Sequence, residues 1–153
     1  MPTIGEQVPD FTLANQDNQT VTLSELRGKK VILFAYPRAN TKGCTTQACG
    51  FRDLTPKVAA GDDVVVLGIS DDPVVKLKAW HEAESFGYDL LSDPDHAVIE
   101  AWGAWGEKNM YGKKYMGTIR SHWVIDSDGT LLDEQIKISP QKSVNQALKV
   151  IGE

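Results

Sequence analysis

The two cysteines are the residues of this chain most able to do chemistry. Cys44 and Cys49 are the only cysteines among 153 residues, and they lie five positions apart. They follow an apolar run at residues 31–36, which is typical of a buried strand, and a turn that carries Pro37 and Gly43. Cys44 therefore stands where a helix is expected to begin, and the free N–H groups and partial positive charge of a helix N-terminus stabilise a thiolate. A thiolate with a second thiol nearby indicates redox chemistry.

The spacing of the two cysteines limits what they can do on a regular helix. Five residues of helix separate two Cα atoms by roughly 8.6 Å, at about 1.5 Å of rise and 100° of turn per residue. A disulfide needs its two Cα atoms within about 6.8 Å of each other. We therefore expect a reduced, folded state and an oxidised state in which the first turns of the helix are unwound.

Other interpretations of the cysteine pair have to be weighed. Cysteines are often small buried hydrophobic residues without a chemical role. A zinc site needs about four ligands, and His81, His96 and His122 form no ligand-spaced motif with the cysteines, so we expect no metal site. A thioredoxin-like protein disulfide oxidoreductase is the alternative enzyme class, although it uses C-x-x-C where this chain has C-x4-C. A redox sensor or chaperone that binds partners when the helix unwinds is a third class.

Length and composition favour one globular domain over residues 1–153. The chain is 41% hydrophobic and 24% charged, as is usual for globular proteins, and it is long enough to bury a core. The net charge is −5 and the 16 Lys and Arg residues are scattered, which argues against a nucleic-acid partner. No apolar stretch approaches the roughly 20 residues that span a bilayer, and no signal-peptide pattern is visible. We therefore expect a cytoplasmic protein without a membrane partner, and in the cytoplasm paired cysteines are more often catalytic or metal-binding than structural.

The elements that must position the cysteines follow from the apolar periodicity and from the glycine and proline residues. Apolar and β-branched runs predict strands at residues 11–13, 20–23, 31–36, 64–70, 119–125 and 130–138. Helices are expected at residues 24–28 (one turn), 41 or 44 to 60, 73–86, 96–102 and 139–151. Residues 103–116 predict a long loop. This order is that of an α/β, thioredoxin-like fold, with a central mixed β-sheet flanked by helices and an N-terminal hairpin extension.

The motifs also resemble those of a known family. The pattern Pro37-x-x-x-Thr41-x-x-Cys44 resembles the active-site pattern of the peroxiredoxins, thiol peroxidases on a thioredoxin-like fold. Residues 43–53 are similar to the Q-type branch, also called bacterioferritin comigratory proteins, in which the resolving cysteine lies five residues after the peroxidatic one. Further similar stretches occur, in the right order, at residues 5–13, 68–70, 91–94 and 120–126.

The resemblance implies a role for each of five residues. Cys44 would be the peroxidatic cysteine, which becomes a sulfenic acid, and Cys49 would resolve it as an intramolecular disulfide. Thr41 and Arg120 would hydrogen-bond the thiolate and the peroxide, and Pro37 would shield Cys44 from water and over-oxidation. The implied partners are a hydroperoxide, either hydrogen peroxide or an organic hydroperoxide, and thioredoxin or a similar dithiol reductant. The resemblance further implies a monomer without a cofactor.

The sequence alone leaves the roles of several neighbouring residues open. An arginine inside the apolar run 119–125 needs an anionic partner when buried, and a thiolate would supply one to Arg120. His122 shares a strand face with Arg120, and we expect no direct role for it. Gln47 could line the pocket or face solvent, so it is left out of the catalytic set. The branch usually has a proline where this chain has Lys42, which predicts a more mobile first helical turn and an altered reductant preference.

Overall fold

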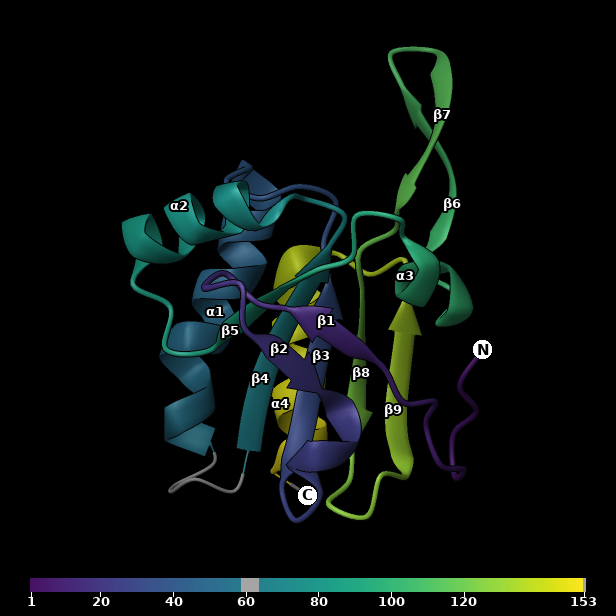
Figure 1. Ribbon diagram of the computed structural model, residues 1–153. Coiled ribbons are helices and arrows are strands. Elements are labelled where there is room, and N and C mark those ends of the chain that lie inside the picture. Colours follow the sequence, from purple (N-terminus) through teal and green to yellow (C-terminus); the bar gives the residue numbers. More distant parts are fainter. Residues whose placement is uncertain (59–63, 153) are drawn as a thin grey trace.

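The computed structural model describes residues 1–58 and 64–152 as a mixed α/β structure (Figure 1). Its strands are β1 (Thr12–Ala14), β2 (Thr20–Thr22), β3 (Lys30–Ala35), β4 (Val64–Ser70), β5 (Asp89–Ser92), β6 (Trp105–Met110), β7 (Lys113–Thr118), β8 (Ser121–Ile125) and β9 (Leu131–Ile136). Its helices are the 3-10 turn η1 (Leu23–Leu26) and the α-helices α1 (Lys42–Val58), α2 (Val74–Glu84), α3 (Ala97–Ala101) and α4 (Pro140–Ile151).

Seven of the strands form one mixed sheet in the order β2-β1-β5-β4-β3-β8-β9. The strand β3 lies inside this sheet, where it pairs parallel with β4 and antiparallel with β8. The parallel pairing brings the carboxyl ends of β3 and β4 to the same edge of the sheet. The chain leaves β3 at this edge and enters α1, so the expected thioredoxin-like arrangement, with its N-terminal hairpin of β1 and β2, is confirmed.

The alternation of side chains along β3 supplies the core on both faces of the sheet. Ile32 and Phe34 pack in a buried cluster with residues of α1, α2 and α4. Val31 and Leu33 point to the other face and pack in a second cluster with residues of α3 and the N-terminal segment. All four side chains are at most 3% exposed. Because successive residues of a strand face opposite sides, a continuous apolar run is what a strand covered on both faces requires.

The predicted loop at residues 103–116 is wrong. The strands β6 and β7 pair antiparallel from Trp105 with Thr118 to Met110 with Lys113, and this hairpin stands out from the body of the molecule (Figure 1). Its two turn residues, Tyr111 and Gly112, both have positive φ, as a tight two-residue hairpin turn requires. The sequence did not reveal this hairpin because apolar and polar residues do not alternate regularly along the two strands, and because Tyr-Gly is not the usual Asn-Gly or Asp-Gly turn.

Three smaller differences concern one additional short strand and the ends of two other elements. The short strand β5 was not predicted, and the expected strand at residues 119–125 begins only at Ser121. Ser139 stands at the N-cap position of α4, but its side chain makes no capping hydrogen bond. The predicted end of the second helix at residue 60 lies outside the described residues. Within residues 1–58 and 64–152, no helix is long and apolar enough to cross a membrane.

Candidate active site

Cys44 lies in the first turn of α1, directly after the loop that leaves β3. Its side chain is fully buried and its thiol is free. A backbone hydrogen bond of 2.8 Å, from the N–H of Thr45 to the carbonyl of Thr41, forms part of the helical turn that contains it. The first turn of α1 contains no acidic residue. The partial positive charge of the helix N-terminus is therefore not neutralised locally and acts on the sulfur of Cys44.

Arg120 reaches Cys44 from a distant part of the chain. One terminal nitrogen of its guanidinium donates to the sulfur of Cys44 at 3.3 Å, and the other donates to the side-chain oxygen of Gln47 at 2.8 Å. Arg120 is half-buried and immediately precedes β8, rather than lying within a buried strand as expected. Since β8 pairs with β3, its first residues lie at the sheet edge from which α1 begins. The sheet thus brings together two groups that are 76 positions apart.

Thr41 and Pro37 lie in the loop between β3 and α1. The hydroxyl of Thr41 donates to the carbonyl of Arg38 at 2.9 Å, rather than to Cys44, and its side chain is exposed. Pro37 is half-buried just beyond the end of β3. This loop is held by a residue that the sequence patterns did not single out. Asp72 is buried after the end of β4 and accepts hydrogen bonds from the N–H of Ala39 at 2.7 Å and the hydroxyl of Ser70 at 2.9 Å.

Cys49 lies on the same unbroken helix and is also a free thiol. Its sulfur is half-buried and lies 3.5 Å from a carboxylate oxygen of Glu84, at the end of α2. Burial raises the pKa of the Cys49 thiol, the charge of Arg52 opposes this shift, and the hydrogen bond and negative charge of Glu84 add to it. Cys49 is thus held as a thiol by its surroundings, and α1 must unwind before its sulfur can reach that of Cys44.

A line of buried polar side chains continues from Arg120 into the core. The side-chain nitrogen of Gln47 donates to the hydroxyl of Ser143 at 2.9 Å. The same hydroxyl lies 2.8 Å from Nδ1 of His122, whose Nε2 lies 2.9 Å from a carboxylate oxygen of Asp133. Sequence reasoning left Gln47 and His122 outside the site and missed the other two. The one available signal was the occurrence of polar residues at positions of β8, β9 and α4 that point into the core.

Lys108 on β6 is a further cation near the site. It was not singled out from the sequence, because residues 103–116 were predicted to form a loop. It is half-buried and its ammonium donates to the carbonyl of Thr118 at 2.9 Å. Burial lowers the pKa of Lys108, and the negative charge of Cys44 partly offsets this effect. Lys108 therefore adds positive potential around the thiolate.

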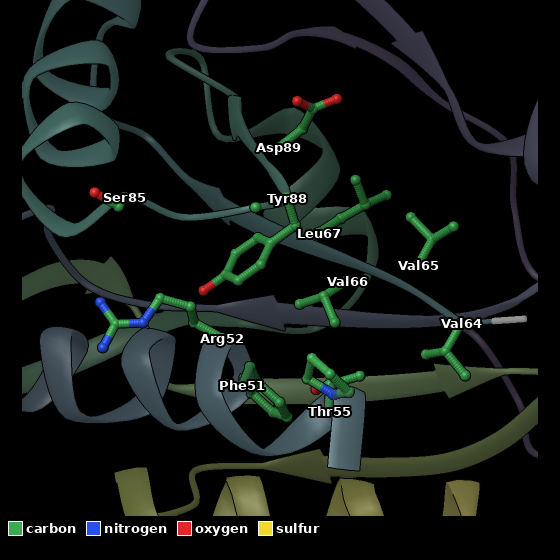
Figure 2. Close-up of a pocket in the computed structure, with 12 residues that line it drawn as sticks. Phe51, Arg52, Thr55, Val64, Val65, Val66, Leu67, Ser85, Tyr88 and Asp89 are labelled. Carbon is green, nitrogen blue, oxygen red and sulfur yellow. The ribbon is translucent and has the colours of Figure 1, made fainter. Parts of the chain in front are cut away.

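A pocket of about 590 Å³ opens on another side of α1 and does not include the cysteines (Figure 2). Its lining includes Phe51, Arg52 and Tyr88, together with residues of β4. Among residues 1–58 and 64–152, no group of three or more side chains is arranged to hold a metal ion.

This chain is similar to members of a known protein family and to bacterial proteins named peroxiredoxins. Residues 4–133 match the AhpC/TSA family. The chain is 45% identical over 128 residues to peroxiredoxin Bcp of Escherichia coli K12, covering 83% of this chain and 81% of that protein. Its fold matches the crystal structure of peroxidoxin BcpB from Mycobacterium tuberculosis with a TM-score of 0.85 and 37% identity, over 99% of this chain and 97% of the other.

A second solved structure carries information about chemistry. It is the bacterioferritin comigratory protein of Xanthomonas campestris, studied for its alkyl peroxide reduction activity. The two folds match with a TM-score of 0.83 at 27% identity, over 94% of this chain and 92% of that one.

Proposed function

Because this chain belongs to the AhpC/TSA family, we propose that its thiol peroxidase reaction uses Cys44 as the peroxidatic residue and Cys49 as the resolving residue. The chain is a peroxiredoxin, an enzyme that reduces hydroperoxides by thiol chemistry. The observation that carries the residue assignment is the 3.3 Å hydrogen bond from Arg120 to the buried sulfur of Cys44 at the start of α1. Among residues 1–58 and 64–152, no guanidinium donates a hydrogen bond to Cys49, which is held as a thiol beside Glu84.

In the first step, the thiolate of Cys44 attacks the terminal oxygen of the hydroperoxide. A sulfur–oxygen bond forms, the O–O bond breaks, and the other oxygen leaves as alkoxide or hydroxide and takes a proton from water. Negative charge moves from sulfur to the leaving oxygen, so a fixed cation that contacts both atoms lowers the barrier. The fork of Arg120 suits this task, since its donors lie in one rigid plane beside the sulfur.

Thr41 and Pro37 complete the proposed site from the loop between β3 and α1. The hydroxyl of Thr41 donates to Arg38, which leaves its oxygen as an acceptor for the proton of a bound hydroperoxide. Pro37 supplies an apolar wall without an N–H group, which limits access of water to the sulfur. The anchor from Asp72 to Ala39 holds both residues in place.

In the second step, the first turns of α1 unwind and the thiolate of Cys49 attacks the sulfur of the Cys44 sulfenic acid. The sulfur–oxygen bond breaks, the hydroxide takes a proton to become water, and the intramolecular disulfide forms. A dithiol reductant, which we propose to be thioredoxin, then becomes oxidised to a disulfide as both cysteines return to thiols. For the substrate we propose hydrogen peroxide and organic hydroperoxides, in keeping with the alkyl peroxide activity of the Xanthomonas campestris relative.

The remaining expectations from the sequence stay predictions. They are a single domain over residues 1–153, a monomeric state, a cytoplasmic location, and the absence of nucleic-acid and membrane partners. Gel filtration with light scattering measures the oligomeric state of the reduced and the oxidised chain directly.

The test of the residue assignment is hydrogen peroxide consumption coupled to thioredoxin, thioredoxin reductase and NADPH. We expect Cys44→Ser to abolish consumption. We expect Cys49→Ser to keep the first, single-turnover oxidation and to lose thioredoxin-dependent cycling. Turnover in the Cys44 variant would refute the peroxidatic assignment, and normal cycling in the Cys49 variant would show that another thiol resolves the sulfenic acid.

A further inference from the structure

The line of polar side chains behind Arg120 has no part in the chemistry described so far. Gln47, His122 and Ser143 are each 0% exposed, and Asp133 is 8% exposed. They come from four different elements, α1, β8, α4 and β9, and yet they form one continuous hydrogen-bonded series that ends on Arg120. Burying four polar side chains is costly unless each has a partner, so a series of this kind calls for an explanation.

The donors and acceptors of this series fit together in only one direction. Arg120 can only donate, so Gln47 must present its oxygen to Arg120 and its nitrogen to Ser143. Burial lowers the pKa of His122 and Asp133 opposes the shift. A neutral His122 that donates from Nε2 to the carboxylate of Asp133 leaves Nδ1 as an acceptor. The hydroxyl of Ser143 then donates to Nδ1 and accepts from Gln47, so each proton has one acceptor.

We propose that Ser143, His122 and Asp133 are positioning residues, which act through Gln47 to hold the Arg120 guanidinium against the sulfur of Cys44. This inference rests on the proposed peroxidase function. The amide oxygen of Gln47 holds one terminal nitrogen of Arg120, and the planar guanidinium then fixes the other at 3.3 Å from the sulfur. Gln47 itself cannot rotate, because its side-chain nitrogen donates to the hydroxyl of Ser143, and that hydroxyl donates its own proton to His122.

The need for such a series follows from the place of Arg120 in the fold. Arg120 is half-buried in the connection between β7 and β8, where a long side chain has several rotamers open to it. Fixed donors stabilise a transition state more than mobile ones, because no reorganisation is needed as charge develops. A buried anchor that reaches back to Asp133 converts a flexible side chain into a fixed one.

The same series depends on the folded state of α1. Gln47 lies between Cys44 and Cys49, in the stretch that must unwind before the disulfide can form. Unwinding therefore removes Gln47 from Arg120 and Ser143. Arg120 is held in its reactive position only while Cys44 is in the helix, where it meets peroxide.

The test is a double-mutant cycle on the rate of peroxide reaction. We would measure the second-order rate constant for oxidation of the reduced full chain by hydrogen peroxide, in competition with horseradish peroxidase. We expect Ser143→Ala to lower this constant about tenfold, less than the roughly 10²-fold effect of a 1 Å misplacement. In the Arg120→Met background, we expect the same Ser143→Ala substitution to change the constant by less than about twofold, because the group it positions is gone.

A matched control removes a buried hydroxyl that makes no hydrogen bond. Thr55 on α1 has a buried hydroxyl without a partner among the described residues, so Thr55→Val should leave the rate constant unchanged. If Ser143→Ala does not fold, Asp133→Asn takes its place in the cycle. This variant should also raise the fraction of His122 protonated on Nδ1, as measured by ¹⁵N NMR of the imidazole.

The outcomes separate the inference from the function on which it rests. If the wild-type chain reacts with peroxide and the Ser143 or Asp133 variant has the same rate constant, the positioning role alone is overturned. Equal losses with and without Arg120 would also overturn it, since a merely structural defect does not depend on Arg120. A wild-type chain that does not react with peroxide would overturn the proposed function and the inference together.

Discussion

Gly43 is the position where a single added methyl group should separate the activity of this enzyme from its stability. Gly43 precedes Cys44 in the first turn of α1. A Cβ atom at this position would lie 3.0 Å from the guanidinium nitrogen of Arg120 that donates to Cys44, and 3.5 Å from a ring carbon of Pro140. A contact of 3.0 Å is tighter than a Cβ atom normally makes, whereas the contact with Pro140 is an ordinary one, so Gly43→Ala should displace the guanidinium by a few tenths of an ångström.

The size of the effect follows from the contact that is disturbed. A hydrogen bond to a charged group contributes about 1.5–3 kcal/mol. Lengthening the 3.3 Å contact between Arg120 and Cys44 without breaking it should forfeit about 1 kcal/mol, which corresponds to roughly a fivefold lower rate constant. Alanine is preferred over glycine within a helix by about 0.5–1 kcal/mol, so the stability of Gly43→Ala should be unchanged or higher. In a chain of this length, that gain corresponds to at most about 4 °C in Tm.

The assay compares two quantities for each variant, the second-order rate constant with hydrogen peroxide and the Tm of the reduced chain. Gly87→Ala is the matched control, because a Cβ atom there would meet nothing within 4 Å. We expect the rate constant to fall only in Gly43→Ala, without a loss of Tm. A rate constant within twofold of the wild type would refute the claim that the position of Arg120 limits the reaction. A parallel fall in Tm would show that the substitution damages the helix instead.

Three further predictions concern the loop before α1 and the resolving step. Asp72→Ala should free the loop held through Ala39, lower the peroxide rate constant several-fold and cost about 1–3 kcal/mol in unfolding free energy, as measured by urea denaturation. Glu84→Gln should lower the raised pKa of Cys49. The thiol form of Cys49 stabilises the intact helix, and this contribution is lost as pH rises through the raised pKa of Cys49. Disulfide formation should therefore accelerate with pH, and the acceleration should occur at lower pH in the variant. Identical pH profiles in single-turnover assays of disulfide formation would contradict this. Lys42→Pro should stabilise the folded first turn of α1 by about 0.4–1 kcal/mol, because proline restricts the backbone of the unwound state. Disulfide formation should then slow about two- to fivefold, and the rate of recycling by thioredoxin should change. Unchanged rates for both steps would exclude an effect of this residue.

The local parts of this protein could be predicted from its sequence. The apolar run at residues 31–36, the turn after it and the cysteine at the start of a helix are all encoded by neighbouring residues, and the structure has them as β3, a loop and α1. The spacing of Cys44 and Cys49 on that helix excludes a disulfide in the folded state by helix geometry alone. The motif around them was sufficient to indicate the family.

The errors of prediction occurred where local patterns are weak. Apolar and polar residues do not alternate regularly along β6 and β7, and most of β7 is exposed, so the hairpin lacks the pattern by which a half-buried strand is recognised. Arg120 was placed inside a strand because apolar neighbours surround it, whereas the strand pairing begins only at Ser121. The residue at which strand pairing begins depends on the neighbouring strand in the sheet, so it cannot be recognised from the few residues around that position.

The partners of the buried polar groups were decided only by the tertiary structure. Residue type and spacing sufficed to single out Cys44 as the reactive atom, because a thiol and a helix start are properties of one short segment. They could not show that Gln47 faces the core, or that Ser143, His122 and Asp133 continue the line from Arg120. A polar side chain bonds whichever group the fold leaves beside it once water is excluded, and that neighbour depends on the order of strands in the sheet and on the helix packed against it.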